Sequence, residues 1–312
     1  MTQLAARTAV LDRLARVSTQ RSTPTLAERL ASLERWVHAD LVDFESELAV
    51  FRGNDARLVH RTAQHLLDLG GKHLRPTCVA LASRFGEGFT PRVRELAVAV
   101  ELVHSATLLH DDVVDVAERR RGQPAASVVY GNAAAIFAGD WLLVAALRRI
   151  SAAGVDGLLD KMLAIIDEMI VAESIQLERR GKLAGTAVRE DYFAIVEGKT
   201  AALFRWAMIA GARAAGLSAS QELALERYGF HLGVAFQAVD DELDYATSSA
   251  DTGKNTLADL REGKVTYPLV VALEREPSLY GRIEALLAVD ADDPDELCAI
   301  ASIVRGSGAL AA

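Results

Sequence analysis

The chain has 312 residues, 51% of them hydrophobic, which is ample for a large buried core, yet no apolar run approaches the roughly 20 residues that a membrane helix needs. Its formal net charge of −9 argues against a nucleic-acid partner, because no basic stripe offsets the acidic residues, although an acidic protein can still bind anionic phosphates through metal ions. Two cysteines, Cys78 and Cys298, and the lack of a secretory signal pattern predict a cytoplasmic protein with no disulfide framework and no stable membrane insertion.

The predicted elements are almost all helices. Residues 1–25 predict a leading segment that is either flexible or a short amphipathic helix. Alternating apolar and polar positions, which are typical of strands, are nearly absent, and no linker or internal repeat interrupts the chain. The pattern therefore predicts one all-α domain over residues 1–312. Ala- and Leu-rich segments with 3.6-residue spacing occupy 26–50, 56–70, 91–116, 132–151, 156–179, 190–215, 219–246 and 266–274.

A first acidic motif lies at the end of the helix predicted over 91–116, in the stretch "LLHDDVVDVAERRRG". Asp111 and Asp115 are one helical turn apart and share a face, with Asp112 beside them. Charges at the end of a buried helix are costly unless they are paired or coordinated. Alone, this spacing also fits an ordinary solvated helix end.

A second acidic motif repeats the same spacing in "GVAFQAVDDELDY", at Asp240, Asp241 and Asp244. Two such helices facing one another would gather carboxylates that repel each other unless a cation binds between them. Oxygen ligands without His or Cys companions favour Mg²⁺ or Mn²⁺ over Zn²⁺. Because Mg²⁺ usually combines a few carboxylates with substrate phosphate oxygens, the pair of motifs predicts a diphosphate ligand bridged by metal.

Cationic residues flank both acidic motifs, as a diphosphate site requires. In "GGKHLRP" a glycine pair allows close approach of a ligand to the backbone, and in "EGKTA" Thr200 adds a hydroxyl. His104 lies on the same predicted helix face as the first aspartates. Each cation alone also fits a surface position, but together they predict an anion site. The candidates are Lys72, Arg75, Arg120, Arg121, Lys199, Lys254 and Lys264.

The ordered motifs between residues 70 and 269 resemble those of the trans-isoprenyl diphosphate synthases, also called polyprenyl synthetases. The pattern is most similar to medium- and long-chain members such as octaprenyl diphosphate synthase. The resemblance implies an all-α bundle of the isoprenoid synthase type with a central cavity, usually as a homodimer. It also implies a prenyltransferase that condenses isopentenyl diphosphate with an allylic prenyl diphosphate, using about three Mg²⁺ ions, or Mn²⁺, per site.

The resemblance assigns roles by position. The metal-binding set, of which some members are supporting partners rather than ligands, is Asp111, Asp112, Asp115, Asp240, Asp241 and Asp244. The isopentenyl diphosphate set is Gly71, Lys72, Arg75, His104 and Arg121. The allylic diphosphate set is Arg120, Lys199, Gln237, Lys254 and Lys264. The residues expected to take part directly in catalysis are Asp111, Asp115, Asp240, Lys199, Thr200 and Gln237.

Product length is expected to depend on Ala106 and Thr107, five and four positions before the first aspartate. Family members that make short products often carry an aromatic residue there. Small side chains would leave the cavity open, which predicts a product of about 30 to 50 carbons. Geranylgeranyl diphosphate is the alternative product.

The chain departs from the family pattern at two places. His73 replaces the second basic residue of the common "GGKR" form. Family members usually continue through final helices beyond the point where this chain stops at "IVRGSGALAA", so those helices are expected to be missing. The rival interpretations are a non-catalytic subunit of a heteromeric synthase, which typically loses aspartates, and a class I terpene cyclase, which normally lacks the second motif.

Overall fold

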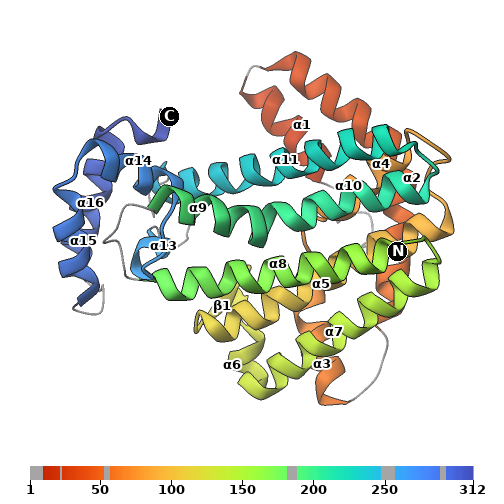
Figure 1. Cartoon of the computed structure of the whole chain (residues 1–312), viewed down its shortest axis with the longest axis horizontal. Helices are drawn as coiled ribbons and strands as arrows, with labels where there is room; N and C mark the ends of the chain where they lie inside the picture. The colour runs from red at the N-terminus through yellow and green to blue at the C-terminus, as the bar shows by residue number, and fades with distance from the viewer. Residues whose placement is uncertain are drawn as a thin grey trace. The chain divides into compact units, whose positions relative to one another are not determined.

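The computed structural model describes residues 10–21, 23–52, 57–180, 188–246, 257–288 and 293–311, and it confirms the predicted all-α class (Figure 1). None of the described helices is both long enough and apolar enough to cross a membrane. The elements are α1 (Val10–Gln20), α2 (Pro24–Arg52), α3 (Leu58–Asp68), α4 (Leu74–Ser83), α5 (Pro91–Val114), β1 (Arg119–Arg120), β2 (Gln123–Pro124), α6 (Ala126–Tyr130), α7 (Asn132–Ala153), α8 (Leu158–Arg179), α9 (Val188–Val196), the π-helical turn η1 (Glu197–Ala201), α10 (Ala202–Ala214), α11 (Ala219–Ala246), α13 (Ala258–Arg261), α14 (Tyr267–Arg275), α15 (Leu279–Ala288), α16 (Pro294–Gly306) and the 3₁₀ turn η2 (Ala309–Ala311).

The chain forms two compact units. The N-terminal unit comprises Met1–Leu163 with Leu203–Gly229, and the C-terminal unit comprises Ala164–Ala202 with Phe230–Ala312. The long helices α8 and α11 each contribute residues to both units. The first acidic motif belongs to the N-terminal unit and the second to the C-terminal unit. A single domain over the whole chain stays a prediction.

Helices α5 and α7 form the core of the N-terminal unit and lie side by side (Figure 1). Helix α5 begins as its sequence predicts, with Thr90 at the N-cap and Pro91 in the first turn, where a missing backbone N–H does no harm. Small residues on α7 allow close approach: a β-carbon on Gly139 would lie 2.2 Å from His110 Nε2. The buried leucines of α5 contribute about 1.5–3 kcal/mol each, which anchors the helix that carries the first acidic motif.

A short β-ribbon follows the first acidic motif directly. Strands β1 and β2 pair antiparallel, with Arg120 opposite Gln123. The two turn residues, Arg121 and Gly122, both have positive φ (52° and 79°), as in the type I′ turns that fit the twist of a two-residue hairpin. The ribbon therefore holds Arg120 and Arg121 in a defined geometry close to the aspartates in sequence.

The C-terminal unit has its own apolar core, to which Tyr245, Leu269, Leu279 and Ile300 contribute. Two of its helices, α15 and α16, lie outside the segments for which helices were predicted. Helix α16 is well capped, because Asp293 accepts hydrogen bonds from two backbone N–H groups of its first turn.

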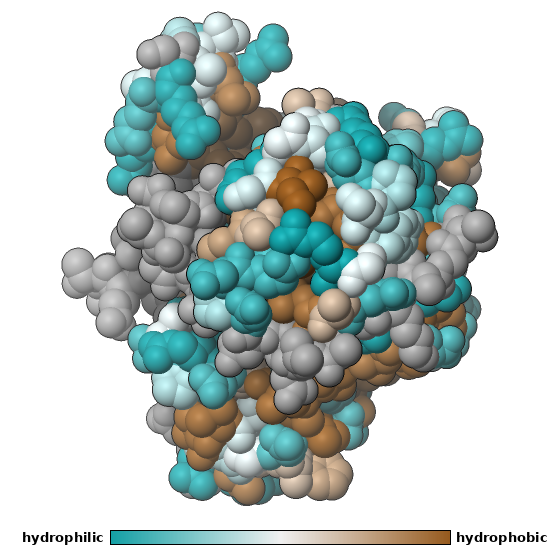
Figure 2. Space-filling model, turned by 90° about the vertical axis from the view of Figure 1, so that its left-hand side faces the viewer, coloured by the Kyte–Doolittle hydropathy of each residue, from teal (hydrophilic) through white to brown (hydrophobic). Residues whose placement is uncertain are grey.

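On the face drawn in Figure 2, hydrophilic residues are interspersed with hydrophobic ones.

The segment predicted as one helix over 190–215 is interrupted. Its first part is α9, its last part is α10, and the π-helical turn η1 lies between them. Helix α4 was also missed, because the Gly70–Gly71 pair ends the preceding predicted helix and leaves only a short apolar segment behind it.

Candidate active site

The three aspartates of the first motif differ in environment. Asp112 is 1% exposed, whereas Asp111 and Asp115 are half-buried. One oxygen of Asp112, Oδ1, accepts hydrogen bonds from two guanidinium nitrogens of Arg120, with Arg120 Nε at 2.9 Å. Arg120, expected to bind the allylic diphosphate, thus holds Asp112 in place when no substrate is present.

The donor set of this motif fits a hard divalent cation. Asp112 Oδ2 is buried and has no hydrogen-bond partner among the described residues, a costly state for a carboxylate oxygen unless something binds it. In the described ranges, no three His, Cys, Asp or Glu side chains form a group that could hold a metal ion. Mg²⁺ usually combines a few carboxylates with waters and substrate oxygens.

The expected isopentenyl diphosphate residues gather within the N-terminal unit. A β-carbon on Gly71 would lie 3.3 Å from Arg121 Nη2 and 3.3 Å from Glu101 Oε1, so a glycine here avoids crowding both groups. The guanidinium of Arg75 lies over the ring of Phe204, 4.6 Å from its centroid, a favourable cation–π contact. Lys72 is exposed.

Burial shifts the pKa values of this cluster. It lowers the pKa of His104 to about 3, an effect that neighbouring Arg75 reinforces, so the imidazole is neutral near pH 7. It also lowers the pKa of Arg75 to about 10, against the attraction of Glu101. Burial alone would raise the pKa of Glu101, but the attraction of His73 outweighs it and lowers that pKa to about 2. Glu101 is therefore a charged centre among the cationic residues, and sequence reasoning missed it. It is the single acidic residue in the apolar stretch 96–110.

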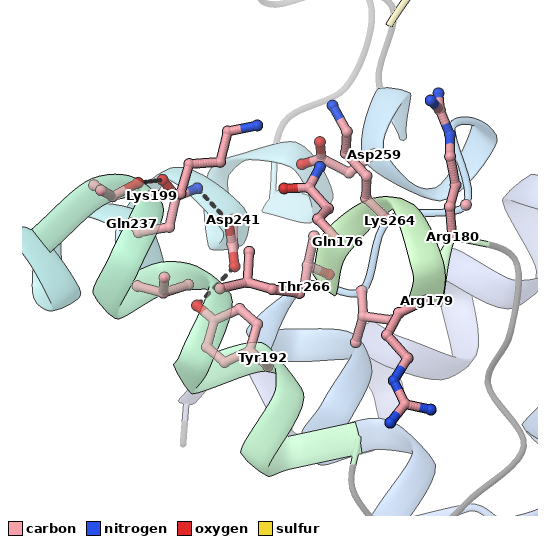
Figure 3. Close-up of a pocket in the computed structure, with 15 residues that line it drawn as sticks. Gln176, Arg179, Arg180, Tyr192, Lys199, Gln237, Asp241, Asp259, Lys264 and Thr266 are labelled. Atoms are coloured by element: carbon pink, nitrogen blue, oxygen red, sulfur yellow. Dashed lines mark hydrogen bonds between the residues drawn. The ribbon is translucent and has the colours of Figure 1, made fainter. Parts of the chain in front are cut away.

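The aspartates of the second motif also differ in exposure, with the middle one buried. Asp240 is exposed and Asp244 is half-buried, while Asp241 is 3% exposed. Asp241 Oδ1 accepts a hydrogen bond from Gln237 Nε2 (2.8 Å), and its Oδ2 accepts one from the Tyr192 hydroxyl (2.9 Å) (Figure 3). Oδ2 also accepts from the Tyr267 backbone N–H (3.0 Å). Because both oxygens are engaged, the geometry favours a supporting role for Asp241 over direct metal binding.

This difference leads to a stability prediction. Replacing Asp241 with alanine should lower the free energy of unfolding by about 2–4 kcal/mol, because one buried and two partly buried donors, from α9, α11 and α14, lose their acceptor. The matched variant Asp240→Ala removes an exposed carboxylate and should unfold like the parent protein. Thermal and urea denaturation of both variants measure the difference. Equal stability of the two variants would contradict the assignment.

A pocket of about 150 Å³ lies beside Asp241 in the C-terminal unit. Figure 3 shows Lys199 and Gln237 on one side of it and Lys264 and Arg180 on the other. Lys199 forms an ion pair with Glu173, and Lys264 with Glu262 (2.6 Å). The pocket thus presents several cations, which suits an anionic ligand. It is lined by Gln176, Arg179, Arg180, Tyr192, Ile195, Val196, Lys199, Thr200, Gln237, Asp241, Asp259, Gly263, Lys264, Val265 and Thr266.

The π-helical turn η1 places Lys199 and Thr200 at this pocket. The Thr200 hydroxyl donates to Gln237 Oε1 at 2.9 Å, so three of the predicted catalytic residues come together. Close packing surrounds the turn: a β-carbon on Gly198 would lie 2.7 Å from the Ala172 β-carbon. Single π turns within helices occur frequently at functional sites.

Several expectations remain outside what the structure tests. Lys254 lies outside the described residues. The two acidic motifs belong to different units, so their approach to one another stays a prediction. Ala106 is buried, and Thr107 is half-buried with its hydroxyl donating to the His104 carbonyl at 2.8 Å. Besides Glu101, sequence reasoning missed polar residues of the C-terminal unit, namely Glu173, Gln176, Arg179, Arg180, Tyr192, Asp259 and Thr266.

Comparison with known proteins gives concordant results. The family model described as "Polyprenyl synthetase" matches residues 56–304, a range that includes every motif singled out above. The chain is 35% identical over 221 residues to octaprenyl diphosphate synthase of Escherichia coli (strain K12), covering 70% of this chain and 68% of that one. It is 37% identical over 263 residues to all-trans-nonaprenyl-diphosphate synthase (geranyl-diphosphate specific) of Rhodobacter capsulatus, covering 81% and 77%. The crystal structure of polyprenyl synthase from Caulobacter crescentus CB15, complexed with calcium and isoprenyl diphosphate, matches with a TM-score of 0.83 at 34% identity, covering 89% of this chain and 85% of that one.

Proposed function

Because the chain belongs to the polyprenyl synthetase family, we propose that it is a trans-polyprenyl diphosphate synthase, a prenyltransferase that condenses isopentenyl diphosphate head-to-tail (1′-4) with an allylic diphosphate. The observation that carries this proposal is the presence of both acidic motifs and their flanking cations inside the family match. The intact aspartates disfavour a non-catalytic subunit, and the second motif disfavours a terpene cyclase.

The proposed cofactor is Mg²⁺, held by carboxylates of both motifs, with Asp111, Asp115 and Asp240 as ligands. All six candidate groups are carboxylates with no His or Cys among them, and Asp112 Oδ2 is buried without a hydrogen-bond partner among the described residues. The Caulobacter relative was crystallised with calcium and isoprenyl diphosphate. Bound Mg²⁺ would neutralise the charge that grows on the departing diphosphate.

The cationic pocket of the C-terminal unit suits the allylic diphosphate. Lys199 and Lys264 would exchange their present glutamate partners for phosphate oxygens. As the allylic C–O bond breaks, its electron pair leaves with the diphosphate, and these ammonium groups stabilise that charge. The Thr200 hydroxyl and the Gln237 amide supply dipoles close by for the allylic cation.

The cluster of the N-terminal unit suits isopentenyl diphosphate. Lys72, Arg75 and Arg121 would bind its phosphates, and neutral His104 would donate an N–H. Held in this way, the isopentenyl double bond attacks the allylic cation from a fixed position, and loss of a proton to the released diphosphate restores an allylic product. No side-chain nucleophile is needed.

The proposed product has about 30 to 50 carbons, since the small side chains of Ala106 and Thr107 would leave room for a long chain. The octaprenyl and nonaprenyl names of the two relatives support a medium or long chain. We also propose a homodimer, because α7 exposes large apolar residues such as Phe137, which is 65% exposed.

Product sizing tests this proposal. The purified protein is incubated with Mg²⁺, isopentenyl diphosphate and farnesyl diphosphate, and the dephosphorylated products are sized. We expect a series that ends at about 30 carbons or more. A stop at about 20 carbons would favour the geranylgeranyl alternative. No elongation by a folded protein would contradict the proposed activity.

A further inference from the structure

A buried carboxylate lies at the centre of the cationic cluster in the N-terminal unit. Glu101 projects from α5 and is 4% exposed. Its Oε1 lies 3.1 Å from His73 Nδ1 and would lie 3.3 Å from a β-carbon on Gly71. Burying a charge is costly unless partners compensate for it, so the position of Glu101 requires an explanation.

Several residues expected to bind isopentenyl diphosphate lie near Glu101. A β-carbon built on Gly71 would also lie 3.3 Å from Arg121 Nη2. The Glu101 carboxylate and the Arg121 guanidinium are therefore both close to the backbone of Gly71. Burial lowers the pKa of Arg75 and of Arg121, and the charge of Glu101 offsets part of that shift. It thereby favours the cationic forms that a diphosphate needs.

His73 connects this carboxylate to the turn that carries Lys72 and Arg75. Its ring nitrogens lie 3.0 Å from Glu45 Oε1 and 3.1 Å from Glu101 Oε1, without the alignment of hydrogen bonds. Burial lowers the pKa of His73, but the attraction of Glu101 and Glu45 outweighs it and raises the pKa to about 9. The residue is thus an imidazolium, and it preserves the positive charge of the basic residue expected at this position.

The backbone at His73 is held in an uncommon conformation. Its φ of 46° and ψ of 40° lie in the left-handed region, which is unfavourable for a residue with a β-carbon. The residue is the N-cap of α4 and has no side-chain capping bond. The two ionic contacts of its ring therefore fix the turn from which α4, and with it Arg75, begins.

We propose that Glu101 is a positioning residue for isopentenyl diphosphate: it holds the Arg121 guanidinium against Gly71 and, through His73, fixes the turn that carries Lys72 and Arg75. The inference rests on the proposed function of this cluster. Arginine and lysine side chains lose much rotamer freedom when they bind, so holding them in place beforehand strengthens substrate binding. Glu101 does not itself touch the reacting atoms.

The test compares Glu101→Gln with the matched control Glu45→Gln. Each variant removes one of the two buried carboxylates that contact His73. Glu101 also lies close to Gly71, whereas no atom of Glu45 is among the three nearest to a β-carbon built there. We expect Glu101→Gln to raise KM for isopentenyl diphosphate about tenfold, with kcat and KM for the allylic substrate within about twofold of the parent. Glu45→Gln also removes one contact of His73 but leaves Glu101 beside Gly71 and Arg121, so it should raise KM for isopentenyl diphosphate clearly less than Glu101→Gln does, with kcat and KM for the allylic substrate near the parent values.

A pH profile adds a readout that a purely structural role would not change. The titratable groups that face His73 are Glu45 from α2 and Glu101 from α5, and Glu101 in turn lies near Arg75, Arg121 and the neutral His104. In the parent protein His73 stays charged through neutral pH, so KM for isopentenyl diphosphate should be flat between about pH 6.5 and 8. In Glu101→Gln the pKa of His73 falls, so this KM should rise with pH in that range.

An unchanged or lower KM in Glu101→Gln would overturn the proposal, because it would mean that Glu101 only neutralises charge. Should that variant fail to fold by circular dichroism, Glu101→Asp keeps the charge but withdraws it from Gly71, and the same rise in KM is expected. Titration calorimetry measures the binding of isopentenyl diphosphate, and turnover is measured in parallel. Together they distinguish failure of the proposed function from failure of the inference about Glu101. A parent protein that binds it but does not condense it sinks the proposed function alone, whereas equal affinity of parent and Glu101→Gln sinks this inference.

Discussion

Replacing Asp111 or Asp240 with alanine should lower kcat by roughly 10²–10³-fold or more, while the helical fold remains intact. Each variant removes a proposed metal ligand, and with it part of the charge stabilisation of the departing diphosphate. Stability should not fall, because Asp240 is exposed and Asp111 is half-buried within a group of like charges whose mutual repulsion decreases. Steady-state kinetics and circular dichroism measure the two effects.

The control for this experiment is Asp160→Ala, an exposed aspartate in the first turn of α8 that lies outside both motifs. It should keep the activity of the parent protein. Raising the Mg²⁺ concentration should restore part of the activity of the two motif variants, since weaker metal binding is the cause of the loss. Full activity in Asp111→Ala and Asp240→Ala would show that neither motif acts in the reaction.

Replacing Thr107 with phenylalanine should shorten the product from about 30–50 carbons to about 15–20 carbons. A ring at this position, four residues before the first aspartate, would block the space into which the growing chain extends. Thr107 is half-buried and can accept a larger side chain, whereas the neighbouring Ala106 is buried at 2% exposure, where a phenylalanine would strain the core. Chromatography of the dephosphorylated products from the parent and the variant measures the shift.

The matched variant Thr107→Val loses the hydroxyl that donates to the His104 carbonyl but keeps the size of the side chain. It should leave product length unchanged, because length depends on the space and not on this hydrogen bond. If Thr107→Phe also made the parent products, the chain would extend elsewhere, and the limit on its length would come from another part of the molecule.

The helical class could be predicted because it depends on local spacing. Apolar residues that recur every 3.6 positions predicted α5, α7, α8 and α11 nearly to their ends. The interruption at η1 was not visible in the sequence, because a π turn adds one residue to a helix without changing its composition. Helices α15 and α16, of 10 and 13 residues, were not predicted, although the shorter α14 was.

The chemistry of the candidate site could also be predicted in outline. Two DDxxD motifs and their flanking lysines and arginines indicated a metal-dependent diphosphate chemistry, because carboxylate spacing and ligand type depend on residue identity alone. The same motifs carried the resemblance to the family that the comparisons establish.

Only the tertiary structure distinguished neighbouring residues with the same chemistry. Asp240 and Asp241 are adjacent aspartates, but one is exposed and the other is buried and accepts three hydrogen bonds from α9, α11 and α14. In the sequence, Glu101 is an isolated acid in an apolar helix. In the structure, His73 and Arg121, from other parts of the chain, lie near it. The sequence by itself determined the helical class and predicted a metal–diphosphate chemistry, since both follow from local spacing and residue type. Burial, hydrogen-bond partners and charge pairing depend on residues far apart in the chain, so the folded structure alone decided which of these groups are exposed and which are buried and paired.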